Sequence, residues 1–221
     1  MKPEHAILKI LWWNVNRRLD AIVKNTSPIC TYCPNIVFTT ETSTGYDALP
    51  VIDGYKLYAD NDIRLLNHGG IAVYVENTTA THVFDVNYKT CFISFRLDYA
   101  PSFIFIGTYI QPESSPYFNE GMFCDLNELL LSACEKNLIP IMGGDMNCRY
   151  GNLNVTFSSM NILYSENIDE NSNHHGRTYG IDLCTSANIF PLNHLKQKKF
   201  SGDFTYLKAD KKSQIDFVYS M

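Results

Sequence analysis

Residues 139–151, IPIMGGDMNCRYG, are the segment around which the rest of the chain is organised. The apolar run 139–142 is typical of a short buried strand, and the two glycines after it indicate where that strand ends. Asp145 and Asn147 follow two residues apart, which places both side chains on one face of the chain. A carboxylate beside a carboxamide at the end of a strand can orient a water molecule and hydrogen-bond a phosphate oxygen. An ordinary turn is the alternative, because Gly, Asp and Asn all favour turns.

The composition is typical of one globular domain spanning residues 1–221. Hydrophobic residues make up 45% of the chain and charged residues 19%, which excludes a disordered chain. The length suffices for one large domain with a substantial core. The formal net charge of -5 provides no overall basic surface, so a nucleic-acid partner would have to be bound by a local patch. No apolar run reaches the length of a membrane span, so we expect no membrane partner.

The seven cysteines and the N-terminal residues indicate an intracellular protein, in the cytoplasm or nucleus. Their number is odd, they form no regular disulfide framework, and the N-terminus lacks the long apolar stretch of a secretory signal. Cys30 and Cys33 form a CxxC pair, but no second pair with zinc-ligand spacing accompanies it. His174 and His175 lie in the polar run ENSNHHGR and are predicted to belong to a solvated loop. No obligate protein partner is evident from the sequence.

Hydrophobic patterning along the rest of the chain predicts strands, helices and one long loop. Strands are expected at residues 6–15, 36–40, 71–75, 91–97, 103–110, 189–193, 204–207 and 215–220, and helices at 17–24, 122–136 and 179–187. The pair Asp53-Gly54 predicts a tight hairpin turn between LPVI and YKLY, and residues 152–177 an irregular surface loop. Strands and helices alternate toward both ends of the chain, whereas the strands in its middle follow one another without helices. We therefore expect an α/β fold whose sheets are not simply parallel.

A series of short motifs occurs in a recognisable order along nearly the whole chain. The motifs are WNVN (residues 13–16), TTET (39–42), HGGIAVYV (68–75), GTYIQP (107–112), GGDMN (143–147), FTYL (204–207) and SQIDFV (213–218). This series resembles the endonuclease/exonuclease/phosphatase superfamily, and more narrowly the endonuclease domain of LINE-type non-LTR retrotransposons. The resemblance implies a two-sheet α/β sandwich with helices packed outside.

The same resemblance implies a divalent-metal-dependent endonuclease that hydrolyses DNA phosphodiester bonds, with Mg²⁺ or Mn²⁺ as cofactor and DNA as partner. The implied metal-binding residues are Glu41 and Asn16, the implied catalytic residues are Asn14, Tyr109, Asp145, Asn147 and Asp216, and the implied substrate-binding residues are Thr205 and Lys208. One carboxylate plus an amide is sufficient for Mg²⁺, which keeps several waters. Abasic-site nucleases of the superfamily usually carry an acid in place of Asn16, so weaker metal binding is expected here.

The chain departs from the superfamily pattern at its C-terminus. In the superfamily, the acid that corresponds to Asp216 orients a histidine contributed by a final strand. None of the six histidines of this chain follows Asp216. We therefore expect a fold truncated at its C-terminus, either a piece of a longer polyprotein with a reverse transcriptase or a degenerate copy.

Two alternatives to the endonuclease remain open. One is a catalytically silent remnant or nucleic-acid-binding fragment, for which the lysines between residues 196 and 212 offer the candidate basic surface. The other is a phosphatase of the same superfamily, since the core chemistry is shared and a fold does not fix the substrate.

Overall fold

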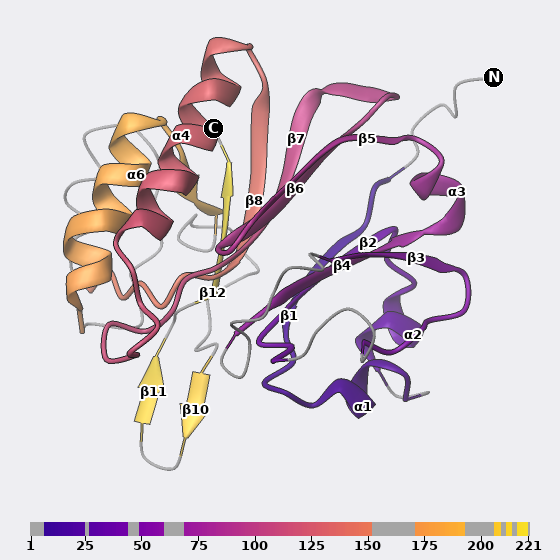
Figure 1. Cartoon of the computed structure of the whole chain (residues 1–221), viewed down its shortest axis with the longest axis horizontal. Coiled ribbons are helices and arrows are strands. Elements are labelled where there is room, and N and C mark those ends of the chain that lie inside the picture. The colour runs from indigo at the N-terminus through magenta and orange to yellow at the C-terminus, as the bar shows by residue number, and fades with distance from the viewer. Residues whose placement is uncertain are drawn as a thin grey trace, which may run out of the picture.

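Two mixed β-sheets pack face to face, with helices on their outer sides (Figure 1). The structure is a computed structural model that describes residues 7–24, 27–43, 49–59, 69–151, 171–192, 206–208, 211–213 and 216–220. The arrangement confirms the predicted two-sheet α/β sandwich. No helix in these ranges has the length and apolarity needed to cross a membrane.

The first sheet has four strands in the order β1-β2-β4-β3. They are β1 (Ile10–Asn14), β2 (Ile36–Thr40), β3 (Tyr55–Ala59) and β4 (Ile71–Glu76). β1 and β2 run parallel, and the other pairs are antiparallel. The short helices α1 (Leu19–Ile22) and α2 (Pro28–Tyr32) lie between β1 and β2 in the chain, and α3 (Asn77–Ala80) follows β4.

The second sheet has six strands in the order β5-β6-β7-β8-β12-β9. They are β5 (Val83–Lys89), β6 (Phe92–Leu97), β7 (Ala100–Tyr109), β8 (Ile139–Asp145), β9 (Phe190–Pro191) and β12 (Asp216–Ser220). β7 and β8 are its parallel pair. A separate two-stranded ribbon pairs β10 (Tyr206–Lys208) with β11 (Lys211–Ser213).

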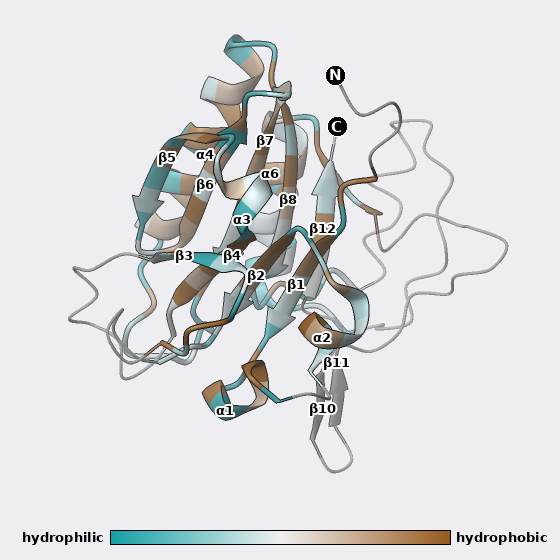
Figure 2. Cartoon of the chain, turned by 90° about the vertical axis from the view of Figure 1, so that its right-hand side faces the viewer, coloured by the Kyte–Doolittle hydropathy of each residue, from teal (hydrophilic) through white to brown (hydrophobic). Residues whose placement is uncertain are grey.

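Aromatic rings fill the space between the sheets. Phe38 of β2 stacks on Trp12 of β1 at 5.8 Å and on Phe95 of β6 at 5.9 Å between ring centroids. A Cβ at Gly107 of β7 would lie 2.1 Å from Cδ1 of Phe38, so this position admits only glycine. Figure 2 shows the hydrophobic residues that line this core as brown bands along β2, β7 and β8. The glycine therefore lets the two sheets approach.

The helix α4 (Gly121–Glu135) covers the outer face of the second sheet together with α6 (Ile181–Ser186). Its residues Phe123, Leu126, Leu130 and Ala133 are buried at helical spacing, as the pattern over 122–136 predicted. A π-helix, His175–Gly180, leads directly into α6.

Several local features of the structure differ from the sequence predictions. The turn at Asp53-Gly54 exists, but residues 49–52 form no strand beside β3, so the predicted hairpin is wrong. The turn has Gly54 at φ +84 and a hydrogen bond from Tyr55 N to Ile52 O, which fits a type II turn rather than the predicted type I′. Strand β5 and helix α2 were not predicted. The expected absence of a final strand stays a prediction.

Candidate functional site

The candidate site lies where the parallel pairs of the two sheets end. In the first sheet Asn14 pairs with Thr40, so Glu41 follows at the same edge. In the second sheet Tyr109 pairs with Asp145. Parallel strands bring their carboxyl ends to one edge, and the packing of the two sheets brings both edges together.

One carboxamide joins the two edges. Nδ2 of Asn14 donates to Oε1 of Glu41 at 3.2 Å and to Oδ2 of Asp145 at 3.0 Å. Oδ1 of Asn14 accepts the backbone N–H of Asn16 at 2.9 Å. A single amide thus holds two carboxylates from different sheets side by side, and the next residue but one, Asn16, is exposed.

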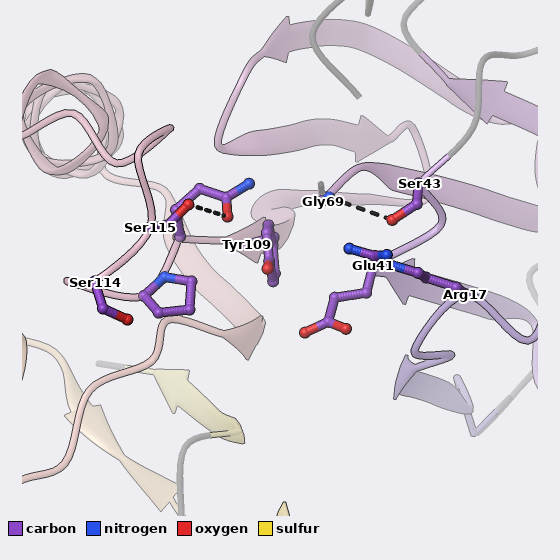
Figure 3. A pocket seen from close by; sticks show the side chains of 9 residues that line it. Arg17, Glu41, Ser43, Gly69, Tyr109, Ser114 and Ser115 are labelled. Atoms are coloured by element: carbon purple, nitrogen blue, oxygen red, sulfur yellow. Dashed lines mark hydrogen bonds between the residues drawn. The ribbon is translucent and has the colours of Figure 1, made fainter. Parts of the chain in front are cut away.

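Glu41 lines a pocket of about 220 Å³ that opens between the two sheets. The pocket is lined by Arg17, Glu41, Ser43, Gly69, Tyr109, Gln111, Pro112, Ser114 and Ser115. In Figure 3 the carboxylate of Glu41 and the ring of Tyr109 point into the same open space, with Arg17 beside Glu41. Glu41, at φ +54, and Arg17, at φ +63, both have left-handed backbone conformations, and the N–H of Arg17 donates to the carbonyl of Glu41 at 2.9 Å. Such conformations cost energy in residues other than glycine and cluster at functional sites.

Asp145 and Asn147 are held by the backbone around them. Asp145 is 1% exposed, and its Oδ1 accepts the N–H of Asn147 at 2.8 Å. Nδ2 of Asn147 donates to the carbonyl of Ile110 at 2.8 Å, and the N–H of Ile110 donates to the carbonyl of Asp145 at 2.9 Å. β8 runs through both glycines to Asp145, so the prediction that the glycines end this strand is wrong. The hydrogen bonds that follow the strand fix both polar side chains beside the end of β7.

Tyr109 is almost fully buried at the floor of the pocket, with 6% of its surface exposed. Burial raises the pKa of its phenol well above the ordinary value, and the carboxylates of Glu41 and Asp145 raise it further. The phenol therefore stays protonated at neutral pH and can donate a hydrogen bond.

The remaining predicted site residues are placed only in part. Asp216 begins β12, where its Cα pairs with that of Asp145, and its side chain lies outside the described part of the structure. Lys208 ends β10 in the two-stranded ribbon, and its side chain is likewise not described. Thr205 and the lysines of residues 193–200 lie outside the described residues.

The structure corrects the prediction for the histidine pair. His174 is exposed as expected, but His175 is fully buried, with its ring 4.4 Å from Phe118 and 5.2 Å from Phe123 between centroids. Burial lowers the pKa of His175, and the nearby Glu113 carboxylate opposes this shift in part. The long-range aromatic contacts that bury His175 leave no signal in the polar run ENSNHHGR.

Other residues at the site were also missed from the sequence. Arg17 and Gln111 line the pocket, and Asn173 contacts the loop that follows Asp145. Arg17 lies one residue beyond the WNVN motif, so its nearness in sequence was the one available signal.

The oxygen donors at the site fit a hard divalent cation. Within the described ranges no cluster of three or more His, Cys, Asp or Glu side chains could hold a metal ion. Mg²⁺ does not need such a cluster, because it binds through one or two carboxylates and keeps several waters. Glu41 provides one carboxylate, which Asn14 holds next to that of Asp145, and the exposed Asn16 follows two residues after Asn14.

Solved structures of DNA repair nucleases share this fold over nearly the whole chain. AP endonuclease LMAP from Leishmania major is 15% identical with a TM-score of 0.68, and the match covers 96% of this chain and 78% of that one. The 3′-5′ exonuclease NExo from Neisseria meningitidis is 16% identical with a TM-score of 0.67, covering 96% and 86%. A Neisseria NExo structure described as a 3′ phosphatase bound to product DNA hairpin is 15% identical with a TM-score of 0.66, covering 97% and 86%.

The sequence itself matches no protein-family profile and no curated protein. At such low identity the structural likeness establishes the fold alone. The chain has the endonuclease/exonuclease/phosphatase fold, as the order of its motifs implied.

Proposed function

We propose that this chain is a divalent-metal-dependent endonuclease that hydrolyses DNA phosphodiester bonds. The observation that carries the proposal is the amide of Asn14, which donates to Glu41 and to Asp145 at the edge where the two sheets meet. The DNA-acting relatives with the same fold support DNA as the substrate.

The metal would be held by Glu41 and Asn16. Glu41 would supply the charged oxygen, and the exposed Asn16, whose N–H is bound by Asn14, would supply a neutral one. When bound there, Mg²⁺ or Mn²⁺ neutralises the phosphate and stabilises the charge that develops on its oxygens. A neutral second ligand makes the site less negative, so we expect weaker metal binding than with two carboxylates.

The polar groups around the metal position have separate roles. Asp145 orients the attacking water, since hydrogen bonds from Asn14 and Asn147 fix both of its oxygens in place. Asn147 uses one N–H of its carboxamide on the carbonyl of Ile110, and the second N–H finds no protein partner in the described part of the chain, so it can donate to a phosphate oxygen. The protonated phenol of Tyr109 donates to another phosphate oxygen.

Three further residues complete the proposal. Asp216, the backbone partner of Asp145, would orient a histidine as in the superfamily, and Thr205 and Lys208 would contact the DNA strand. The pocket beside Glu41 supports a sugar-phosphate ligand, because Arg17 and three serines line it together with Tyr109 and Pro112. Because the motifs resemble those of LINE-type endonucleases, the more specific activity that we propose is the nicking of target DNA inside a cell. The endonuclease would then be part of a polyprotein that also contains a reverse transcriptase.

The test is nicking of supercoiled plasmid with Mg²⁺, by the 221-residue chain and by a longer version extended at its C-terminus. We expect nicking that EDTA abolishes, that Mn²⁺ restores, and that is lost in Glu41→Ala. Removing a histidine from such a site costs about 10²–10⁴-fold in acid-base catalysis, so the longer version is expected to be faster if it supplies one.

Two parallel reactions separate the alternatives. Release of phosphate from a 3′-phosphorylated oligonucleotide or from a phosphoinositide, with plasmid left intact, would identify a phosphatase instead. Plasmid binding without any hydrolysis by either version would identify a silent, nucleic-acid-binding chain.

A further inference from the structure

Hydrogen bonds to its backbone and its side chain hold Asn147 in one orientation. Its backbone is left-handed, at φ +50, which is uncommon for a residue other than glycine. Its N–H donates to Asp145, its Nδ2 to Ile110, and its carbonyl accepts Nδ2 of Asn173 at 2.6 Å. The first two partners adjoin it in the site, whereas Asn173 comes from a segment 26 residues further along the chain.

The side chain of Asn173 forms hydrogen bonds with the loop 147–151 and with its own segment. Besides donating to Asn147, its carboxamide accepts on Oδ1 the N–H of Arg149 at 2.8 Å and that of Gly176 at 2.9 Å. Its backbone N–H donates to the carbonyl of Arg149 at 3.1 Å. Beside it, Ser172 forms an antiparallel bridge with Tyr150. Residues 171–173 therefore run along the loop 147–151 as a short antiparallel strap.

The segment after Asn173 is pressed against the same loop. A Cβ at Gly176 would lie 2.1 Å from the carbonyl oxygen of Arg149, so only glycine permits this approach. The fully buried ring of His175 packs among Phe118 and Phe123, and its backbone N–H donates to Oε1 of Glu113 at 2.7 Å. The segment continues as a π-helix, a rare form that is frequent at functional sites. The strap is thus anchored at its C-terminal end.

We propose that Asn173 is a positioning residue that sets the orientation of the phosphate-binding Asn147. It touches neither metal nor substrate and acts through the carbonyl of Asn147. The inference rests on the proposed function, because that function gives Asn147 its phosphate contact. A misplacement of about 1 Å in such a group can lower the rate about 10²-fold, so the strap matters more for turnover than for binding.

Two substitutions separate positioning from support of the fold. Asn173→Asp keeps oxygens that accept from Arg149 and Gly176, but it replaces the donor to Asn147 by an oxygen that repels the carbonyl. Asn173→Ala removes all three side-chain hydrogen bonds. The matched control is Asn87→Asp, which adds the same charge on an exposed residue of β5, the edge strand of the second sheet.

The experiment measures kcat and KM for Mg²⁺-dependent DNA cleavage, together with amide hydrogen exchange of a peptide covering residues 146–151. We expect Asn173→Asp to lower kcat by roughly 10- to 100-fold with KM within about threefold, and Asn87→Asp to match the parent. We expect Asn173→Ala to speed exchange in this peptide, since the N–H of Arg149 loses its partner.

Two results would overturn the proposal: a parental kcat in Asn173→Asp, or a change confined to KM. Unchanged exchange in Asn173→Ala would overturn it as well. If neither the chain nor its longer version cleaves DNA, the proposed function fails, and the exchange measurement alone then decides whether Asn173 holds the loop.

Discussion

Replacing Asn14 by Asp tests the central geometry of the site most directly. The substitution keeps the oxygen that accepts the N–H of Asn16, but it replaces the donor Nδ2 by a carboxylate oxygen. In the parent chain Nδ2 lies 3.2 Å from Glu41 and 3.0 Å from Asp145, so the new oxygen would lie about 3 Å from two other carboxylates. At an effective dielectric constant of about 20, each such repulsion amounts to about 5 kcal/mol. The chain can relieve it by protonating one carboxyl.

Protonation sets an upper limit on the loss of stability. Keeping a carboxyl with a pKa near 4 protonated at pH 7 costs about 4 kcal/mol, at roughly 1.4 kcal/mol per pH unit. We therefore expect Asn14→Asp to lower the free energy of unfolding at pH 7 by about 3–4 kcal/mol without metal. For a chain of this size that corresponds to a fall in Tm of roughly 6–16 °C.

Divalent cations should reverse much of this loss, because a cation between the three carboxylates replaces the missing donor. At a concentration about a hundredfold above its Kd, a bound ion stabilises by about 2.7 kcal/mol. The assay is thermal unfolding with EDTA and with Mg²⁺. The control, Asn137→Asp, places the same charge on an exposed residue just before β8 begins, at the opposite end of that strand. A Tm in Asn14→Asp no lower than in this control, or one that Mg²⁺ fails to raise, would show that Asn14 does not sit between two carboxylates.

Three other substitutions test the core, the buried histidine and the metal site. Gly107→Ala should cost about 1–3 kcal/mol by urea unfolding, because the new methyl group meets the ring of Phe38 at 2.1 Å and that ring is stacked on both sides. The folded-state pKa of His175 is lowered by burial, so the unfolded chain binds its proton first and stability falls as the pH drops below about 6.5. His175→Phe should remove that acid-dependent loss from unfolding curves between pH 7.5 and 5, whereas His174→Phe should retain it. Asn16→Asp should bind Mg²⁺ more tightly in a calorimetric titration, and an unchanged Kd would place Asn16 outside the metal site.

The local parts of the fold were predictable because their signals are local. The helix α4 shows its buried face as a helical repeat of Phe123, Leu126 and Leu130, and the strands β2 and β8 show as short apolar runs. Strand β5 was not predicted because it is an edge strand and most of its residues are exposed. Its register with β6 is also irregular between Phe84 and Asn87. An exposed, bulged strand lacks the alternation on which the prediction relies.

The sequence indicated which residues form the candidate site, but not how their side chains are arranged in space. The structure brings Asn14, Glu41, Tyr109, Asp145 and Asn147 together at one edge of the sandwich, while their catalytic and metal-binding roles stay predictions, as do those of Asn16, Asp216, Thr205 and Lys208. Asn173 and His175 were missed, since their contacts join segments more than twenty residues apart and their neighbours in sequence are polar.

Local sequence indicates which polar groups lie at strand ends, because apolar runs bounded by glycine, proline and polar residues encode strands locally. The position of the Asn14 amide between Glu41 and Asp145, by contrast, arises from the packing of the two sheets. That contact spans 131 residues and depends on how closely two sheets pack around the ring of Phe38 and the bare Cα of Gly107. Packing distances of this kind arise from the combined shapes of many side chains, so no short stretch of sequence specifies them.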